Sequence, residues 1–552
     1  MKIKDLFISA KDSNVDKISS LFDFLNQNVE QYIDPKYPVL RGKKTSYYKM
    51  LQKATLPPKG HSPQTALAHF SRLFKRAVRW QHPGAFININ PPANIASIVA
   101  SFYTSLYNPN FAQDESTGLL SAAEMIVTKH LAELAQWDWE KSAGIFTFGG
   151  KGTNMYAVKT ALQNVNPEAG KTGINGADYF IVSNEKSHPC HTEVCDWLGL
   201  GKNNCLRIPV TKDGTIDLAE MEKAVCARIE KGQKLTGIIL NGGTTNEIIV
   251  DPIEKVVELR EKIIKKYKLN YVPHLHIDSV IGWAWLFFRY YDFKQNPFKM
   301  SAEEVRKIKS LSQKISAVRL ADSFGADFHK TGFCPYISSI FMVKDKNSLY
   351  RLGGKTAPDI KTLCHGSYSP FEYSMELTRS SIGPVSAYVA LETFGIEGFQ
   401  RLIYNIMTNG EYIRHLLREN EQFEVINPET EGIATLFIAK PQGFHHSYAE
   451  LIKLDEKKIA KVVDYNHQFY LYSLQALENR EVEFKMTFSK SYKPFGCKNK
   501  TGALKIYQMS PTATKSEIKR YIKQLIALKQ KFDKKHRLMK EDANKPVDFV
   551  YR

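Results

Sequence analysis

The segment GIFTFGGKGTNMYAVKTALQ places three glycines, Gly149, Gly150 and Gly152, directly before a helical pattern. A glycine-rich turn that enters a helix points backbone N–H groups at a phosphate, and the helix dipole favours the negative charge. The segment matches neither the P-loop nor the dinucleotide-binding pattern, because Lys151 is not followed by Ser or Thr and no GxGxxG is present. It therefore predicts a phosphate-binding turn of another kind.

The segment SNEKSHPCHTEVCDWLGLG follows the apolar run DYFIVS, so we expect His188 near the carboxyl end of a strand. Ligands of open α/β sheets bind at that edge, and an imidazole there can lie flat against an aromatic cofactor ring. A structural histidine is an open alternative. A metal site is another, because His188, Cys190, His191 and Cys195 are crowded. We expect no metal, since that spacing fits no standard zinc pattern.

Two further segments place a carboxylate and an amine among apolar residues. The run PHLHID ends in Asp278, and a buried aspartate needs a cationic or donor partner. A protonated pyridine nitrogen would be such a partner, and the pair would make the ring an electron sink. Lys330, in ADSFGADFHKTGFCPY, is expected on a loop between two strands. Its apolar and aromatic neighbourhood is expected to lower the pKa of the amine, which suits Schiff-base chemistry.

The elements that would position these segments alternate between strands and helices. The strand candidates DYFIVS, TGIILN, HLHID and SSIFMV predict a parallel or mostly parallel sheet that is covered on both faces. Beyond Pro384 a helix leads to the strand-like runs ATLFIAK, VEFKMTFS and ALKIYQMS, which predict a smaller α+β unit. We expect a helical arm at 1–93, a large domain at 94–390 and a small domain at 391–552.

Composition favours a soluble cytoplasmic protein. The chain has 552 residues, of which 43% are hydrophobic, and its seven cysteines lack the spacing of a disulfide framework. The N-terminus lacks the apolar stretch of a signal peptide, and no segment reaches the roughly 18 apolar residues of a membrane span. The net charge of +19 lies largely on amphipathic helical patterns, which we interpret as solvated helix faces. A nucleic-acid-binding scaffold is the non-enzyme alternative, although no RNA-binding motif is evident.

In their order along the chain, these segments resemble the group II PLP-dependent amino-acid decarboxylases, especially the glutamate decarboxylase-like branch. GIFTFGGKGTNMYA is similar to that family's phosphate loop, SHPCH to its ring-stacking histidine segment, and NGGTTNEIIVDPI to its Gly-Thr-Thr segment. HIDSVIG is similar to its aspartate strand and DFHK to its cofactor lysine motif. The resemblance extends from about His82 to Thr514.

The resemblance implies a type I aminotransferase-like fold, pyridoxal 5'-phosphate (PLP) as the cofactor, and a homodimer with the active site at its interface. It implies that Lys330 carries PLP as a Schiff base, that Asp278 pairs with the pyridine nitrogen, and that His188 stacks on the ring. Further cofactor-binding positions implied by the resemblance are Gly149, Gly150, Lys151, Asn154, Thr244 and His329.

Four positions depart from the family pattern. Lys151 replaces a small residue, and its ammonium would either pair with the phosphate or point outward. Ser279 and Val280 replace two alanines, which changes the packing of the pocket. Lys505 replaces an arginine that holds the substrate carboxylate, and a lysine cannot reproduce the bidentate fork. Arg379 is the next candidate for that contact.

The resemblance implies α-decarboxylation of an L-amino acid, with a loop tyrosine that protonates Cα. Tyr368 is the first candidate and Tyr373 the second; a surface tyrosine without a catalytic role is the alternative for either. The basic chain and the similarity of GGKGTNMY to the glutamate branch favour aspartate or glutamate as substrate. Aromatic amino acids are the runner-up. A PLP-dependent carbon–carbon lyase is a different alternative, because such enzymes share a similar His-Lys motif.

Overall fold

A seven-stranded sheet forms the centre of the computed structural model, which describes residues 3–11, 14–444, 446–451, 453–495, 497 and 499–539. The strand order is β1-β7-β6-β5-β4-β2-β3, and β7 alone runs against its neighbours. The strands are β1 (Ala143–Thr147), β2 (Tyr179–Asn184), β3 (Cys205–Ile208), β4 (Lys234–Asn241), β5 (His274–Asp278), β6 (Ser323–Asp327) and β7 (Ser339–Val343). The prediction of a mostly parallel sheet is confirmed.

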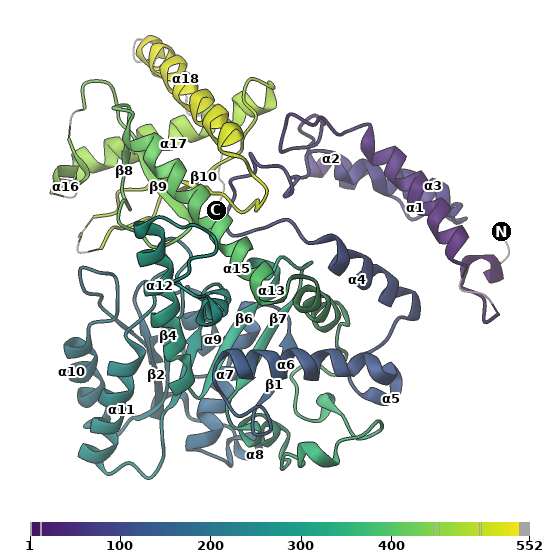
Figure 1. The fold of residues 1–552 in the computed structure, drawn as a ribbon, viewed down its shortest axis with the longest axis vertical. Coiled ribbons are helices and arrows are strands. Elements are labelled where there is room, and N and C mark those ends of the chain that lie inside the picture. Colours follow the sequence, from purple (N-terminus) through teal and green to yellow (C-terminus); the bar gives the residue numbers. More distant parts are fainter. Residues whose placement is uncertain are drawn as a thin grey trace.

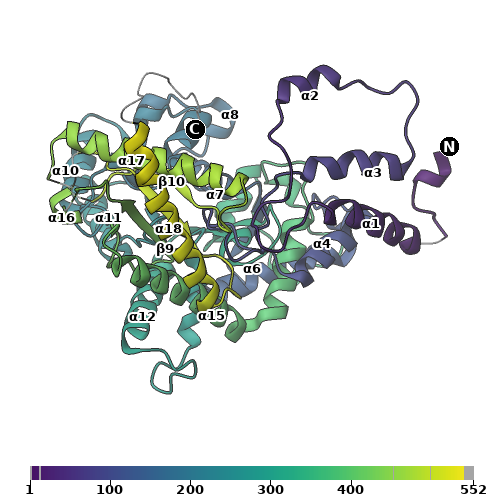
Figure 2. The ribbon, with the colours of Figure 1, turned by 90° about the horizontal axis from the view of Figure 1, so that it is seen from above.

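Helices cover both faces of this sheet, as Figures 1 and 2 show. Ile181 and Ile239 pack on one face against α7, whereas Val182 and Ile238 belong to the larger apolar core on the other face. Side chains of successive strand residues point to opposite faces, which explains this alternation. The covering helices are α6 (Ala122–Leu134), α7 (Gly150–Val165), α9 (Cys190–Trp197), α10 (Leu218–Ile229), α11 (Ile253–Tyr267), the 3-10 helix η6 (Gly282–Tyr290) and α12 (Ala302–Ser316).

A second, antiparallel sheet has the order β10-β11-β9-β8. Its strands are β8 (Phe423–Val425), β9 (Ala434–Ala439), β10 (Thr487–Ser489) and β11 (Ala503–Tyr507). The helices α17 (Glu456–Glu478) and α18 (Lys515–Met539) pack against it around a separate apolar core. Strands were expected at all three C-terminal runs and are confirmed, although β10 covers only the end of VEFKMTFS. Residues 540–552 of the expected small domain lie outside the described residues.

The long helix α15 (Ile382–Arg418) connects the two sheets and contributes side chains to both cores. Its backbone is non-helical at Gly395, where φ is 55° and ψ is −165°. A residue with a side chain rarely adopts such angles, so this glycine permits the kink. Shorter helices lie in the connections: α5 (Asp114–Thr117), α8 (Ala169–Thr172), α13 (Phe328–Thr331), α14 (Lys346–Tyr350) and α16 (Tyr448–Leu451).

The N-terminal helices α1 (Val15–Glu30), α2 (Tyr47–Lys53) and α3 (Pro63–Ser71) extend away from the main body in both views (Figures 1 and 2). They have almost no buried residues. Large apolar side chains are exposed on this arm and on the neighbouring α4 (Ile95–Tyr107), among them Phe22, Tyr47, Leu51, Leu56, Leu73, Ile95, Val99, Tyr103 and Tyr107. None of the described helices has the length and apolar character that crossing a membrane requires.

Candidate active site

The predicted site residues lie at or just after the carboxyl ends of four strands of the large sheet, of which β5 and β6 are neighbours. Asp278 is the last residue of β5, Lys330 follows β6, the glycine-rich turn follows β1, and His188 follows β2. Carboxyl ends of parallel strands meet at one edge of a sheet, where ligands of such folds bind. Lys330 lies in the single-turn helix α13 rather than on the expected loop.

Asp278 is buried, and one of its two carboxylate oxygens takes part in two hydrogen bonds. His191 Nε2 lies 2.8 Å from Oδ2, and Asn154 Nδ2 donates to the same oxygen at 3.2 Å. Burial alone would raise the pKa of Asp278, but the His191 contact outweighs it and holds the pKa well below its usual range. Among the described residues, the buried oxygen Oδ1 has no hydrogen-bond partner. The carboxylate is therefore ionised and has one oxygen free for another donor.

Lys330 lies beside a second buried carboxylate. Its Nζ is 2.8 Å from Asp327 Oδ2, and 24% of the lysine side chain is exposed. Burial lowers the pKa of Lys330, but the charges of Asp327 and Asp278 outweigh it and raise the pKa above the ordinary value. The expectation that apolar surroundings lower this pKa is therefore wrong for the protein without its cofactor. Asp327 is also held by Ser339, whose Oγ donates to Oδ1 at 2.5 Å.

Two imidazoles flank this pair of carboxylates. The His188 side chain is exposed, and its Nδ1 accepts a hydrogen bond from the Cys190 backbone N–H. Partial loss of hydration around the ring lowers the pKa of His188. His329 is buried beside Asp327, with 3.5 Å between Nε2 and Oδ2, and burial lowers its pKa too. The His329 ring packs 4.2 Å from the ring of Tyr336. Both rings are therefore neutral near pH 7.

The glycine-rich turn forms the start of α7. Gly149 has φ of 118°, a value that favours glycine, and Gly150 is so close to Asp327 that a Cβ would lie 3.1 Å from Oδ2. The Lys151 ammonium pairs with Glu193 and lies over the Trp197 ring, so it points toward α9. Asn154 Nδ2 also donates to the Gly150 carbonyl.

Thr244 lies in the turn after β4, where its Oγ1 accepts from the Ile249 backbone N–H at 3.0 Å. The same turn contains Glu247, which is buried and accepts a hydrogen bond from the Tyr492 hydroxyl at 2.9 Å. Burial raises the pKa of Glu247 to about 7, although Lys186 and Lys505 are close enough to lower it. Lys505 is on β11, and burial lowers its own pKa.

Tyr368 and Arg379 lie in another buried cluster, around Glu124. The Tyr368 hydroxyl donates to Glu124 Oε2 at 2.8 Å, and Arg379 donates to the same oxygen at 3.0 Å and to the Phe111 carbonyl. Burial raises the pKa of Tyr368 further above its usual value. Tyr373 is buried as well, with its ring 4.2 Å from that of Tyr350. The structure thus does not join these side chains to Lys330 and Asp278 through the described contacts.

Three residues of this region were given no role from the sequence: His191, Asp327 and Glu247. The sequence suggests His191 only as a metal ligand, and the motif DFHK contains Asp327 without indicating a role for it. A signal for both existed, because each directly adjoins a segment that carries a candidate residue. Glu247 follows the Gly-Thr-Thr turn, but its burial depends on contacts with Tyr492 and could not be read from the local pattern.

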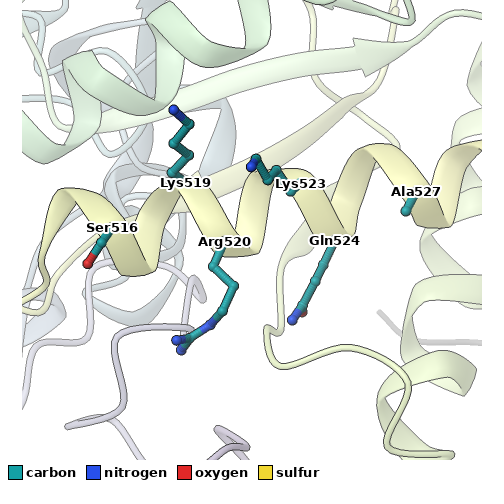
Figure 3. Close-up of a pocket in the computed structure, with 6 residues that line it drawn as sticks. All are labelled: Ser516, Lys519, Arg520, Lys523, Gln524 and Ala527. Carbon is teal, nitrogen blue, oxygen red and sulfur yellow. The ribbon is translucent and has the colours of Figure 1, made fainter.

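A possible metal-binding cluster and a hollow along α18 are two further features of the structure. Cys190, His191 and Asp278 could converge on a metal ion in the described part of the chain, but His191 Nε2 and Asp278 Oδ2 already contact each other at 2.8 Å. A hollow along α18 is lined by Ser516, Lys519, Arg520, Lys523, Gln524 and Ala527, and Figure 3 shows Lys519 and Arg520 projecting to opposite sides of the helix. Arg520 is already paired with Glu483, and this hollow contains none of the predicted site residues.

Comparison with known proteins identifies the family. The model for the pyridoxal-dependent decarboxylase conserved domain matches residues 46–440, which is most of the chain. The chain belongs to the pyridoxal-dependent decarboxylases. Its cofactor is PLP, and its reaction class is that of a carboxy-lyase acting on amino acids.

Solved structures share the fold at low sequence identity. Mouse CSAD superposes with a TM-score of 0.75 at 16% identity and covers 93% of this chain and 99% of its own. The glutamate decarboxylase domain of a diaminobutyrate-pyruvate transaminase and L-2,4-diaminobutyrate decarboxylase from Vibrio parahaemolyticus gives 0.72 at 18%, covering 96% and 98%. Tryptophan decarboxylase from Catharanthus roseus gives 0.70 at 15%, covering 97% and 99%.

The residues present fit this cofactor. The free Oδ1 of Asp278 can accept from a pyridinium N–H, because that oxygen is buried and has no other partner among the described residues. The turn before α7 offers backbone N–H groups to a phosphate, and Lys330 has an amine within the same site.

Proposed function

We propose that this decarboxylase removes CO2 from the α-carboxylate of aspartate or glutamate and that Lys330, Asp278 and His188 are its central cofactor contacts. The observation that carries the assignment is the buried carboxylate of Asp278, which has one oxygen without a partner among the described residues and interacts with the partly exposed Lys330 amine. Bound PLP supplies an electron sink for the electron pair left at Cα. Asp278 keeps the ring nitrogen protonated, His188 covers one ring face, and Asp327 holds the Lys330 ammonium when that amine is free.

The charge near β11 supports an acidic substrate. The charges of Lys186 and Lys505 lower the pKa of Glu247, but burial outweighs them and raises it to about 7. Near neutral pH this carboxyl is therefore only partly ionised, so the two lysines leave a surplus of positive charge. Such a surplus attracts carboxylates. We propose that Lys505 meets the substrate α-carboxylate and that Lys186 favours an acidic side chain.

An aromatic amino acid is the second candidate substrate. The Lys186 ammonium lies over the ring of Phe495, 5.9 Å from its centroid, and the Tyr492 hydroxyl contacts Glu247. Aromatic side chains beside the same lysines favour a substrate with a ring. A solved relative in fold is a tryptophan decarboxylase in complex with L-tryptophan.

A screen of the twenty amino acids, with CO2 and amine both measured, tests the reaction and the substrate together. We expect CO2 and the corresponding amine from aspartate or glutamate. An aromatic amine as the main product would support the second candidate instead. Cleavage of a phosphorylated amino alcohol without CO2 release would contradict decarboxylation altogether.

We also propose that the protein is a homodimer. The exposed apolar side chains of the N-terminal arm and α4 gather on neighbouring helices, and soluble monomers rarely expose a large contiguous apolar patch. A second copy that packs on this arm would cover them, which agrees with the interface active site that the family resemblance implies.

Replacing Lys505 with methionine should raise KM and lower kcat. Holding the carboxylate both binds the substrate and orients the bond that breaks, so both constants depend on the contact. The loss of a charge-assisted hydrogen bond should cost about 1.5–3 kcal/mol in kcat/KM. Steady-state kinetics on the preferred substrate measure this change.

The matched control is Lys485→Met, since burial lowers the pKa of Lys485 too, but its electrostatic neighbours are Arg76 and Glu478. Lys505→Arg should keep or improve kcat/KM, because arginine restores a bidentate fork. Unchanged kcat/KM in Lys505→Met would remove Lys505 from the substrate contact.

A further inference from the structure

We infer that His191 is a positioning residue that fixes and ionises Asp278 through a directed hydrogen-bond chain from Arg207 and Ser183. This inference rests on the proposed role of Asp278 as the partner of the cofactor ring nitrogen. It concerns residues of α9, β2 and β3 that make no proposed contact with the cofactor themselves.

The chain of hydrogen bonds is continuous. Arg207 NH1 donates to Ser183 Oγ at 3.3 Å, Ser183 Oγ lies 2.7 Å from His191 Nδ1, and His191 Nε2 lies 2.8 Å from Asp278 Oδ2. Ser183 and His191 are fully buried, so water does not compete for these contacts. Arg207 is itself anchored by the carbonyls of Glu185 and Ser187.

The chemistry of Arg207 gives this chain its direction. A guanidinium can only donate, so Ser183 Oγ accepts from Arg207 and has its own hydrogen available for His191 Nδ1. The Asp278 carboxylate can only accept, so His191 Nε2 is the donor in its contact with Oδ2. A Ser183 hydroxyl that turns its hydrogen toward Nδ1 favours the tautomer of His191 that carries its hydrogen on Nε2.

This arrangement determines which oxygen of Asp278 is free. His191 and Asn154 both donate to Oδ2, which fixes the plane of the carboxylate and leaves the buried Oδ1 unpaired among the described residues. Burial would otherwise favour the neutral carboxylic acid, which binds a pyridinium poorly. His191 thus acts on the ring nitrogen through Asp278.

The test compares two ligands that differ only at the ring nitrogen. The Kd of the apoprotein is measured for PLP and for a PLP analogue in which C–H replaces that nitrogen. We expect the wild-type protein to bind PLP more tightly than the analogue, so the Kd of the analogue divided by the Kd of PLP is large. His191→Leu should reduce this ratio at least about tenfold, because it removes a charge-assisted hydrogen bond. His191→Gln, which keeps an N–H donor, should recover part of the ratio.

The matched control is His274→Leu. His274 is a buried histidine on β5, the strand that contains Asp278, and like His191 it contacts a serine, with 2.7 Å between its Nε2 and Ser323 Oγ. It should leave the ratio of Kd values unchanged even if it lowers the melting temperature. Should His191→Leu fail to fold, Ser183→Ala provides the same comparison, with a smaller reduction of the ratio.

The outcomes separate this inference from the proposed function. If the wild-type protein binds PLP with a clear preference over the analogue, and the His191 and Ser183 variants keep that preference, the inference is wrong and the role of Asp278 stands. If the wild-type protein shows no preference, the proposed role of Asp278 is itself wrong.

Discussion

Borohydride treatment of the PLP-loaded protein should bleach its yellow colour and fix the cofactor to a single peptide that contains Lys330. Lys330→Ala should abolish this covalent adduct and lower turnover by roughly a thousandfold or more, because Lys330 supplies the amine beside Asp327 and Asp278. Asp327 and Asp278 raise the pKa of Lys330 in the protein without cofactor, so covalent capture of PLP should be faster at higher pH. Absorbance and mass spectrometry of the digested protein measure these effects.

Lys344→Ala is the control for that experiment, since Lys344 lies just after β7 and its ammonium donates to the Arg319 carbonyl outside the site. It should retain both the adduct and the activity. An adduct on a lysine other than Lys330, or a protein that binds no PLP, would overturn the central assignment.

Local sequence patterns predicted the elements of the site well. HLHID coincides with β5, and the runs DYFIVS, TGIILN and SSIFMV match β2, β4 and β7 to within two residues. These strands are short apolar runs between turn residues, so their hydrophobic pattern alone indicates them. A parallel sheet brings its carboxyl ends together, which explains why Asp278, Lys330 and the glycine turn, at the ends of β5, β6 and β1, lie at one edge.

Contacts between distant residues could not be predicted in this way. Tyr368 is expected to be catalytic because of its place in a loop, and Arg379 is expected to replace Lys505 at the substrate. Both side chains instead bond to Glu124, which lies about 250 positions earlier in the chain. Lys151 adjoins the phosphate turn in sequence, but the packing of α9 against α7 gives it Glu193 as a partner. Burial and charge pairing across the fold determine these partners, and neither is encoded in local periodicity.

The Lys330 environment shows the same limit for electrostatics. An apolar sequence neighbourhood indicates burial, which by itself lowers the pKa of an amine. The structure adds two carboxylates, Asp327 at 2.8 Å and Asp278, and their charges reverse the direction of the shift. The sign of a pKa shift therefore depends on which charges share the site as well as on how apolar the neighbourhood is.

Asp278→Asn should bind PLP but lose turnover by about a hundredfold to a thousandfold, the usual effect of removing one preorganised charge from an active site. The amide has one acceptor and one donor. His191 and Asn154 both donate to the position of Oδ2, so the amide oxygen should occupy it and the NH2 group should replace Oδ1. A donor would then face the ring nitrogen, which could no longer be held protonated, and the electron sink would weaken. The kcat of the loaded variant and the absorbance of its cofactor measure this loss.

Asp322→Asn is the matched control, because Asp322 lies at the amino end of β6 and pairs with Arg260 at 2.7 Å, away from the cofactor site. Removing that charge should lower the melting temperature, since it breaks a partly buried ion pair, and should leave kcat nearly unchanged. Asp278→Asn should show the opposite pattern, with a large loss of kcat and a spectral change. Near wild-type turnover in Asp278→Asn would instead make Asp278 a buried structural carboxylate, and the hydrogen bonds from His191 and Asn154 would then serve only to satisfy it.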